Sequence, residues 1–130
     1  MILTLLLANT FILAALIVSQ PLWREINIGI PYALSNLDHR RDEGVFARRL
    51  SMTVTNQIEN LCLVIPISVI ALSLESSPGA AIATITYLHI GARFAYVAVT
   101  LFGIPYIRSI VWAVGFGTWG ILTWKIIQSM

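Results

Sequence analysis

Four long apolar stretches constrain the fold of this chain more than any other feature. The first covers residues 2–22 and is apolar except at Thr4, Asn9, Thr10, Ser19 and Gln20. About 20 such residues, rising 1.5 Å each along a helix, cover the ~30 Å hydrocarbon core of a bilayer. We therefore predict a membrane-spanning helix here. We expect it to be retained, because nothing basic precedes it and no small-x-small cleavage site leads into a polar mature start.

Three further membrane-spanning helices are predicted along the rest of the chain. They cover residues 45–74, 80–102 and 105–128. The first of these three has a polar first half and an apolar second half that contains Pro66, which a membrane helix tolerates as a kink. Pro105 suits the first turn of the last helix. The connections are predicted to be a water-exposed loop over residues 23–44, with a solvated run of mixed charge at residues 38–43, and a tight turn at residues 75–79.

The composition excludes a soluble globular protein. Apolar residues make up 58% of the 130 residues and charged residues 11%, against ~45–50% and ~25% in soluble domains. So few charged residues cannot form a surface that faces water on all sides. The length suits one domain. We therefore predict an all-α membrane protein, a bundle of four transmembrane helices that forms a single domain over residues 1–130.

The distribution of basic residues predicts the orientation of this bundle. The first loop and the residues beside it carry Arg24, Arg40, Arg41, Arg48 and Arg49, and Arg108 follows the third loop. Because short loops rich in Arg and Lys stay in the cytoplasm, loops one and three are expected to be cytoplasmic. The net charge of +2 is too small and too dispersed for a nucleic-acid footprint, so no nucleic-acid partner is expected.

Neither the cysteine nor the histidines indicate a metal site. Cys62 is the only cysteine, which excludes an intramolecular disulfide and sites built from several cysteines. It lies in an apolar segment with no base at helical spacing, and we predict a small buried hydrophobic residue rather than a nucleophile. His89 has no second histidine or carboxylate at ligand spacing, so we predict a hydrogen-bonded packing role for it and no bound metal.

Charged and polar residues inside the predicted spans are the candidate functional residues. A charge at mid-helix costs at least ~2.5–3.5 kcal/mol, so Glu59 and Arg93 each need a partner, water or a ligand. Helical spacing puts the polar residues of the second and third helices on one stripe of each helix, and we predict that both stripes face inward. The second helix contributes Arg49, Met52, Thr53, Asn56, Glu59 and Asn60, and the third contributes His89, Arg93, Tyr96 and Thr100.

The start of the last helix completes this candidate site. Arg108 and Ser109 lie at the same depth as the start of the second helix and the end of the third, so the three sets can converge. Guanidinium groups bind carboxylates, a carboxylate binds an ammonium group, and hydroxyl donors suit a sulfur or oxygen anion. The set suits a small zwitterionic ligand. The alternative is a purely structural ion pair between Glu59 and Arg93 that joins two helices.

Two segments resemble a known family of membrane proteins. RLSMTVTNQIENLCLVIP at residues 49–66 resembles the second-helix signature of the membrane-associated proteins in eicosanoid and glutathione metabolism, the MAPEG family. GARFAYVAVTLFGIPYIRSIVWAVGF at residues 91–116 is similar to the Arg-x-x-Tyr helix, Gly-x-Pro turn and Arg-Ser helix start of bacterial members. With residues 29–36, the span count and the loop lengths, the resemblance covers nearly the whole chain.

The resemblance implies a fold, a cosubstrate and roles for individual residues. It implies a homotrimer in the bacterial inner membrane that holds glutathione between neighbouring subunits and acts as a transferase or peroxidase on lipophilic electrophiles or lipids. Residues implied to hold glutathione are Arg49, Asn56, Glu59, Arg93 and Tyr96. Arg108 is implied to stabilise the glutathione thiolate, with Ser109 beside it as a hydrogen-bond donor.

Two positions depart from the family pattern and keep other functions open. Members that bind glutathione commonly have Arg where this chain has Met52, and often have Tyr where it has Thr100. These departures favour a non-catalytic lipid-binding or scaffold member as the alternative to an enzyme. A third hypothesis, a small proton-coupled transporter with Glu59 as the carrier carboxylate, depends on size and one intramembrane acid alone.

Overall fold

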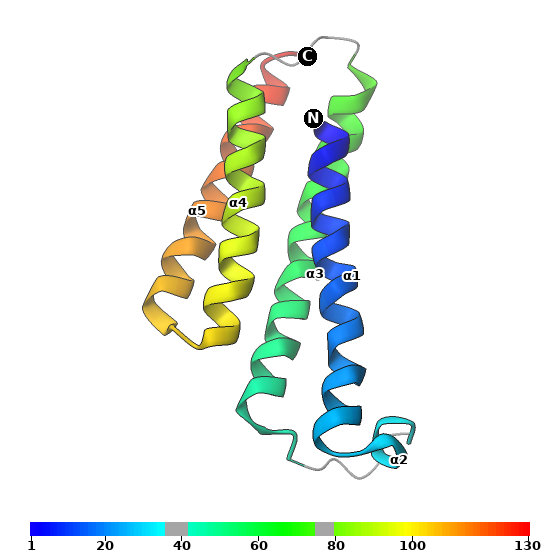
Figure 1. Cartoon of the computed structure of the whole chain (residues 1–130). Coiled ribbons are helices and arrows are strands. Elements are labelled where there is room, and N and C mark those ends of the chain that lie inside the picture. Colours follow the sequence, from blue (N-terminus) through cyan, green and yellow to red (C-terminus); the bar gives the residue numbers. More distant parts are fainter. Residues whose placement is uncertain (36–41, 75–79) are drawn as a thin grey trace.

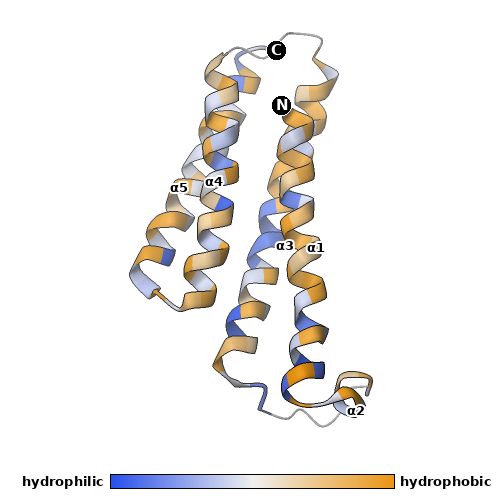
Figure 2. Ribbon diagram, in the orientation of Figure 1, coloured by the Kyte–Doolittle hydropathy of each residue, from blue (hydrophilic) through white to orange (hydrophobic). Residues whose placement is uncertain are grey.

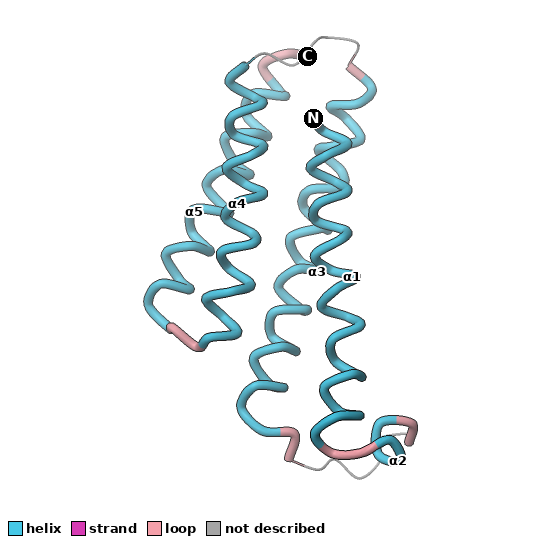
Figure 3. The backbone as a smooth tube through the Cα atoms, in the orientation of Figure 1, coloured by secondary structure: helices cyan, strands magenta, loops and turns pink. Residues whose placement is uncertain are grey.

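Five helices account for most of the described chain. The computed structural model describes residues 1–35, 42–74 and 80–130, so the predicted turn at residues 75–79 and residues 38–41 of the charged run lie outside the described residues. The helices are α1 (Ile2–Asn27), α2 (Ile30–Ala33), α3 (Gly44–Ser73), α4 (Ala80–Phe102) and α5 (Pro105–Ile127). Figures 1 and 3 show this arrangement, in which the described residues contain no strand. The predicted all-α fold is confirmed.

Four of these helices are long and apolar enough to cross a membrane. They are α1, α3, α4 and α5, with 26, 30, 23 and 23 residues. Figure 2 shows hydrophobic residues along most of their length and hydrophilic segments near the middle of α3 and α4. The outward-facing side chains include many large apolar ones, which suits contact with lipid. The protein is an integral membrane protein with several spans.

The bundle is made of two helical hairpins. Figure 1 shows α1 beside α3 and α4 beside α5. One apolar core joins α1, α3 and α5 and contains Leu5, Val64, Ile67, Leu122 and Ile126. A second core joins α1 and α3 and contains Ile12, Leu16 and Leu50. Along α3, the buried polar residue Gln57 lies between Leu50 of the second core and Val64 of the first.

The first helix continues past the predicted boundary at residue 22. The backbone N–H groups of Ile28 and Gly29 both donate to the carbonyl oxygen of Arg24, at 2.9 and 3.0 Å, which closes the last turn. The Arg24 side chain binds Glu43 at 2.9 Å, and these contacts hold five residues in the helix that composition alone assigned to the loop. Gly29, with a φ of 114°, then changes the chain direction before the short helix α2.

Candidate functional site

The polar stripe predicted on α4 faces the interior of the bundle. His89, Arg93, Tyr96 and Thr100 are all buried. His89 Nδ1 lies 3.1 Å from the carbonyl oxygen of Gly115 and 3.1 Å from the hydroxyl of Thr118, which confirms the predicted hydrogen-bonded packing role.

The stripe predicted on α3 is only partly correct. Thr53 is buried and Asn56 and Asn60 are half-buried, but Met52 and Glu59 are exposed on the outer flank of the helix. The reason is the packing of α3 on α1, which turns the face with Leu50, Thr53 and Gln57 inward.

Cys62 is one helical turn beyond Glu59 on the exposed flank of α3. It is exposed, so the prediction of a buried residue is wrong. The buried side of α3 carries Leu61 and Val64 instead. Helical geometry leaves the neighbouring Cys62 pointing about 100° away from Leu61.

Arg93 is held by amide oxygens from α3. Its guanidinium donates from Nε and Nη2 to Gln57 Oε1, at 3.2 and 2.9 Å, and from Nη2 to Asn56 Oδ1 at 2.7 Å. The Tyr96 ring lies under the guanidinium carbon at 5.1 Å, a favourable cation–π geometry. Arg93 is 4% exposed, and its side-chain hydrogen bonds go to neutral amide oxygens.

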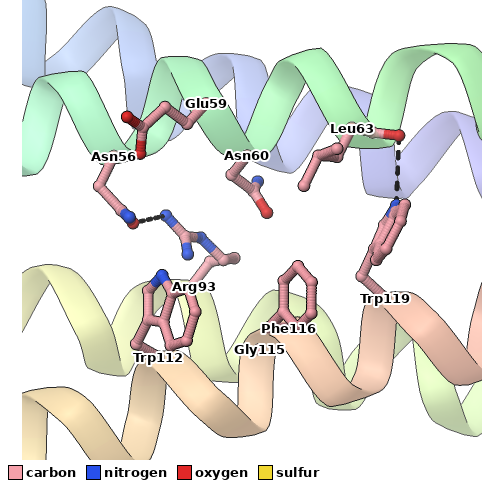
Figure 4. A pocket seen from close by; sticks show the side chains of 9 residues that line it. All are labelled: Asn56, Glu59, Asn60, Leu63, Arg93, Trp112, Gly115, Phe116 and Trp119. Atoms are coloured by element: carbon pink, nitrogen blue, oxygen red, sulfur yellow. Dashed lines mark hydrogen bonds between the residues drawn. The ribbon is translucent and has the colours of Figure 1, made fainter.

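A cavity of about 100 Å³ opens beside Arg93, between α3, α4 and α5. We call it the amide cavity. Its lining residues are Asn56, Glu59, Asn60, Leu63, Arg93, Trp112, Gly115, Phe116 and Trp119. Figure 4 shows the polar side chains of α3 and α4 across the cavity from the aromatic rings of α5. One wall therefore suits charged and hydrogen-bonding groups and the other suits an apolar group.

The ion pair considered between Glu59 and Arg93 is not formed. Among the described residues, the salt bridge is that of Arg24 with Glu43, and Arg93 binds amides instead. Figure 4 shows the Glu59 carboxylate on the α3 side of the cavity, beside Asn56. Glu59 and Arg93 both line the amide cavity, Glu59 at its exposed edge and Arg93 in its buried part, and neither neutralises the other.

A second cavity, of about 200 Å³, lies at the turn between α4 and α5. We call it the arginine cavity. It is lined by Arg49, Thr100, Gly103, Ile104, Pro105 and Arg108. The two guanidinium groups come from α3 and α5, and no lining residue is acidic, so the cavity favours an anion. The buried Thr100 hydroxyl has no hydrogen-bond partner among the described residues.

Arg49 has a structural contact as well as a place in this cavity. Its Nη1 donates to the carbonyl oxygen of Leu101 at 3.4 Å, in the last turn of α4, where a cation is favoured. A Cβ atom at Gly103 would overlap the Arg49 guanidinium, and Gly103 has a φ of 78°. Glycine is therefore needed at this turn both for the backbone and for the close approach of the arginine.

Replacing Gly103 should destabilise the protein. We expect Gly103→Ala to lower the free energy of unfolding by at least ~1 kcal/mol, because alanine strains the positive φ and displaces Arg49. Gly91→Ala is the matched control, since nothing lies within 4 Å of the added Cβ. Thermal unfolding in detergent should show a lower midpoint for the first variant alone. Equal midpoints for the two variants would contradict this role of Gly103.

Ser109 is the candidate that the structure separates from the others. It is exposed and lines neither cavity, and its hydroxyl donates to the carbonyl oxygen of Pro105 at 3.4 Å. Of the other candidate residues, Asn56, Glu59 and Arg93 line the amide cavity and Arg49 and Arg108 line the arginine cavity. Tyr96 lies behind Arg93.

The two cavities lie about one peptide length apart along the bundle. Asn56 is about two helical turns from Arg49 on α3, and Arg93 is about two turns from Thr100 on α4, which is ~10 Å in each case. An extended tripeptide spans at most ~10–11 Å. The cavities are therefore at a spacing that one short peptide can bridge.

Sequence reasoning missed two fully buried residues that support this site. Gln57 holds Arg93, and Asn9 of α1 holds Gln57 through hydrogen bonds of 3.0 and 3.2 Å. Asn9 was visible as one of five polar residues in an apolar span. Its partner on α3 was not, because the contact joins segments 48 positions apart.

Comparison with known proteins gives a family for this chain. No curated protein and no solved structure matches it. The model of the MAPEG family matches residues 1–128, which is almost the whole chain and includes both cavities. This family consists of membrane proteins related to glutathione transferases and peroxidases, whose members generally use glutathione. The chain therefore belongs to the MAPEG family.

Proposed function

We propose that this protein is a glutathione-dependent transferase or peroxidase that acts on lipophilic electrophiles within the membrane. The observation that carries the proposal is the pair of cation-bearing cavities, with Arg93 in one and Arg49 and Arg108 in the other. They lie at a tripeptide's spacing along one seam of the bundle. Family membership supports the choice of glutathione among short anionic peptides.

The lining residues match the charged groups of glutathione. Glu59 supplies a carboxylate for the glutathione ammonium group, and Arg93 supplies the free part of its guanidinium for a carboxylate. Asn56 adds an amide for the peptide backbone, and Tyr96 keeps Arg93 in place through its ring. Arg49 supports the other end of the ligand, where a second carboxylate or the thiolate lies in the arginine cavity.

Arg108 is assigned to the sulfur. A cysteine thiol has a reference pKa of ~8.5, so at neutral pH most of free glutathione is protonated. A guanidinium near the sulfur lowers the thiol pKa and favours the thiolate, which is the nucleophile. In a transfer reaction the thiolate forms a C–S bond while the leaving group departs with its electron pair or an epoxide opens. In a peroxidase reaction two glutathione molecules reduce ROOH to ROH and water and become the disulfide.

The lipophilic partner has a place beside this site. Trp112 and Phe116 stack at 5.5 Å on α5 and form an apolar wall of the amide cavity. Both rings are partly exposed on the outside of the single chain. A lipid-soluble electrophile can therefore approach along α5 from the membrane, while the charged peptide enters from water.

We also propose that the protein is a homotrimer in the bacterial inner membrane, with the first and third loops on the cytoplasmic side. The exposure of Glu59 on the outer flank of α3 supports the homotrimer. A carboxylate facing lipid at mid-helix costs at least ~2.5–3.5 kcal/mol. A neighbouring subunit that covers this flank would remove the carboxylate from lipid and complete the site around glutathione.

Calorimetric titration with glutathione tests the proposed function. We expect Glu59→Gln to raise the Kd for glutathione about tenfold, because a charge-assisted hydrogen bond to the ammonium group is worth ~1.5–3 kcal/mol. Glu25→Gln is the matched control, since Glu25 lines neither cavity, and its Kd should not change. A wild-type protein that takes up no glutathione at millimolar concentration would overturn the proposal.

A non-catalytic lipid-binding or scaffold member is the second candidate. Met52, which replaces the usual family arginine, is 50% exposed and lines neither cavity. One cation of the carboxylate clamp is therefore missing. Copurifying lipid without any thiol-dependent turnover would favour this candidate over the enzyme.

A further inference from the structure

We propose that Asn9 and Gln57 are positioning residues that aim the Arg93 guanidinium at the amide cavity. This inference deepens the proposed function, because it depends on Arg93 binding a carboxylate of glutathione. It rests on a continuous chain of hydrogen bonds from α1 through α3 to α4. Asn9 and Gln57 are each 0% exposed, and Arg93 is 4% exposed.

The chain begins at a backbone carbonyl group, which can only accept. Asn9 Nδ2 donates to the carbonyl oxygen of Leu5 at 2.8 Å, so the side-chain oxygen of Asn9 must face the other way. That oxygen accepts from Gln57 Nε2 at 3.2 Å and from Asn60 Nδ2 at 2.8 Å. The backbone oxygen of Asn9 also accepts from Gln57 Nε2, at 3.0 Å. The orientation of the Asn9 amide is thus fixed.

Fixing Asn9 also fixes Gln57. Because the Gln57 amino group faces the two oxygens of Asn9, its Oε1 must face Arg93. Arg93 can only donate, and Nε and Nη2 both bind that oxygen, at 3.2 and 2.9 Å. A reversed Gln57 amide would put donors against donors at Arg93 and acceptors against acceptors at Asn9. The two ends of the chain therefore permit a single polarity.

This arrangement leaves one edge of Arg93 for a ligand. The bonds to Gln57 and Asn56 use Nε and Nη2. Nη1 lies toward Gly115 of the amide cavity, where a Cβ added to the glycine would be 3.9 Å from it. These partners are neutral amides, so they hold the guanidinium in place without neutralising its charge. A carboxylate partner would neutralise it in an ion pair. A carboxylate that enters the cavity then meets a preoriented, uncompensated cation.

The test is a double-mutant cycle on the Kd for glutathione, with the full chain in detergent. We expect Gln57→Met to raise the Kd about tenfold, since it removes the acceptor that orients Arg93 but keeps the side-chain volume. In an Arg93→Met background the same change should alter the Kd by less than about twofold. Asn9→Leu should raise the Kd by about threefold, since Gln57 then keeps only one acceptor on α1.

Gln57→Glu tests whether the acceptor for Arg93 has to be neutral. A glutamate keeps an acceptor for Arg93 but neutralises the guanidinium in an ion pair, so we expect the Kd for glutathione to rise about tenfold at a temperature where the variant is fully folded. A purely structural Gln57 would leave the Kd of the folded Gln57→Met and Gln57→Glu proteins at the wild-type value and lower only their thermal midpoints. That result, or additive effects in the cycle, would overturn the positioning role.

The same data separate this inference from the proposed function. If Arg93→Met weakens glutathione binding and Gln57→Met does not, the function stands and the positioning role is overturned. If Arg93→Met leaves the Kd unchanged, Arg93 does not bind glutathione, and the proposed site and the positioning role fall together.

Discussion

Arg108→Met is expected to lower the rate of glutathione conjugation about 30-fold at pH 7. The estimate follows from the thiol: with a pKa of ~8.5, only ~3% of glutathione is thiolate at pH 7, so full stabilisation of the thiolate raises its fraction about 30-fold. Removal of the Arg108 guanidinium from the arginine cavity returns the thiol pKa toward its ordinary value. The Kd for glutathione should rise as well, because a guanidinium that lowers the thiol pKa of bound glutathione also stabilises the bound thiolate.

The pH dependence of the conjugation rate tests this role of Arg108. A lowered thiol pKa supplies thiolate at neutral pH, so the wild-type rate should change little between pH 7 and pH 9. The variant rate should rise about tenfold per pH unit until the pH reaches ~8.5, where the two profiles converge. The measurement is the initial rate with a lipophilic electrophile such as a halonitrobenzene across this range.

Arg48→Met is the matched control for Arg108. It removes a guanidinium from the exposed side of α3, outside both cavities, and should leave the pH profile unchanged. Parallel profiles for wild type and Arg108→Met, offset by the same factor at every pH, would show that Arg108 does not act on the thiol.

Arg93→Met should have the largest effect on binding. We expect the Kd for glutathione to rise about 100-fold, because a desolvated, charge-assisted contact worth up to ~3 kcal/mol is lost. The amides of Gln57 and Asn56 also lose their donor and are left facing an apolar side chain. Equilibrium titration with glutathione and with an S-alkyl analogue measures the change.

Comparison of the two ligands tests which group of glutathione Arg93 binds. The S-alkyl analogue has the same charged ends as glutathione but no free thiol, so both should lose affinity to a similar extent. Arg108→Met, by contrast, should distinguish between them. An Arg93→Met protein that loses glutathione but keeps the analogue would assign Arg93 to the sulfur and contradict the site as proposed.

The amino-acid sequence by itself determined the spans and one face of the site. Four apolar stretches predicted the four long helices, and the Gly103–Pro105 segment predicted the turn between α4 and α5. The inward stripe of α4 was predictable because its polar residues, among them His89 and Arg93, repeat on one face and the rest of the helix is mostly apolar. Periodicity alone then selects the buried side.

Tertiary structure alone decided which face of α3 turns inward. Its first half has polar residues on several faces, so the period does not single out Gln57 over Glu59. Packing against α1 makes that selection and leaves Glu59 and Cys62 outside. The extension of α1 to Asn27 was likewise not predicted, and Arg24 within it binds Glu43, 19 positions further along the chain.

The sequence also did not predict the hydrogen-bond partners of the buried polar groups. Asn9 lies in an apolar span, and nothing local indicates that it binds Gln57 or that Gln57 binds Arg93. Local sequence determines where a helix can form, because its hydrogen bonds are internal. Hydrogen bonds between helices depend on how the helices rotate and slide against one another, and that is decided by the packing of the whole bundle.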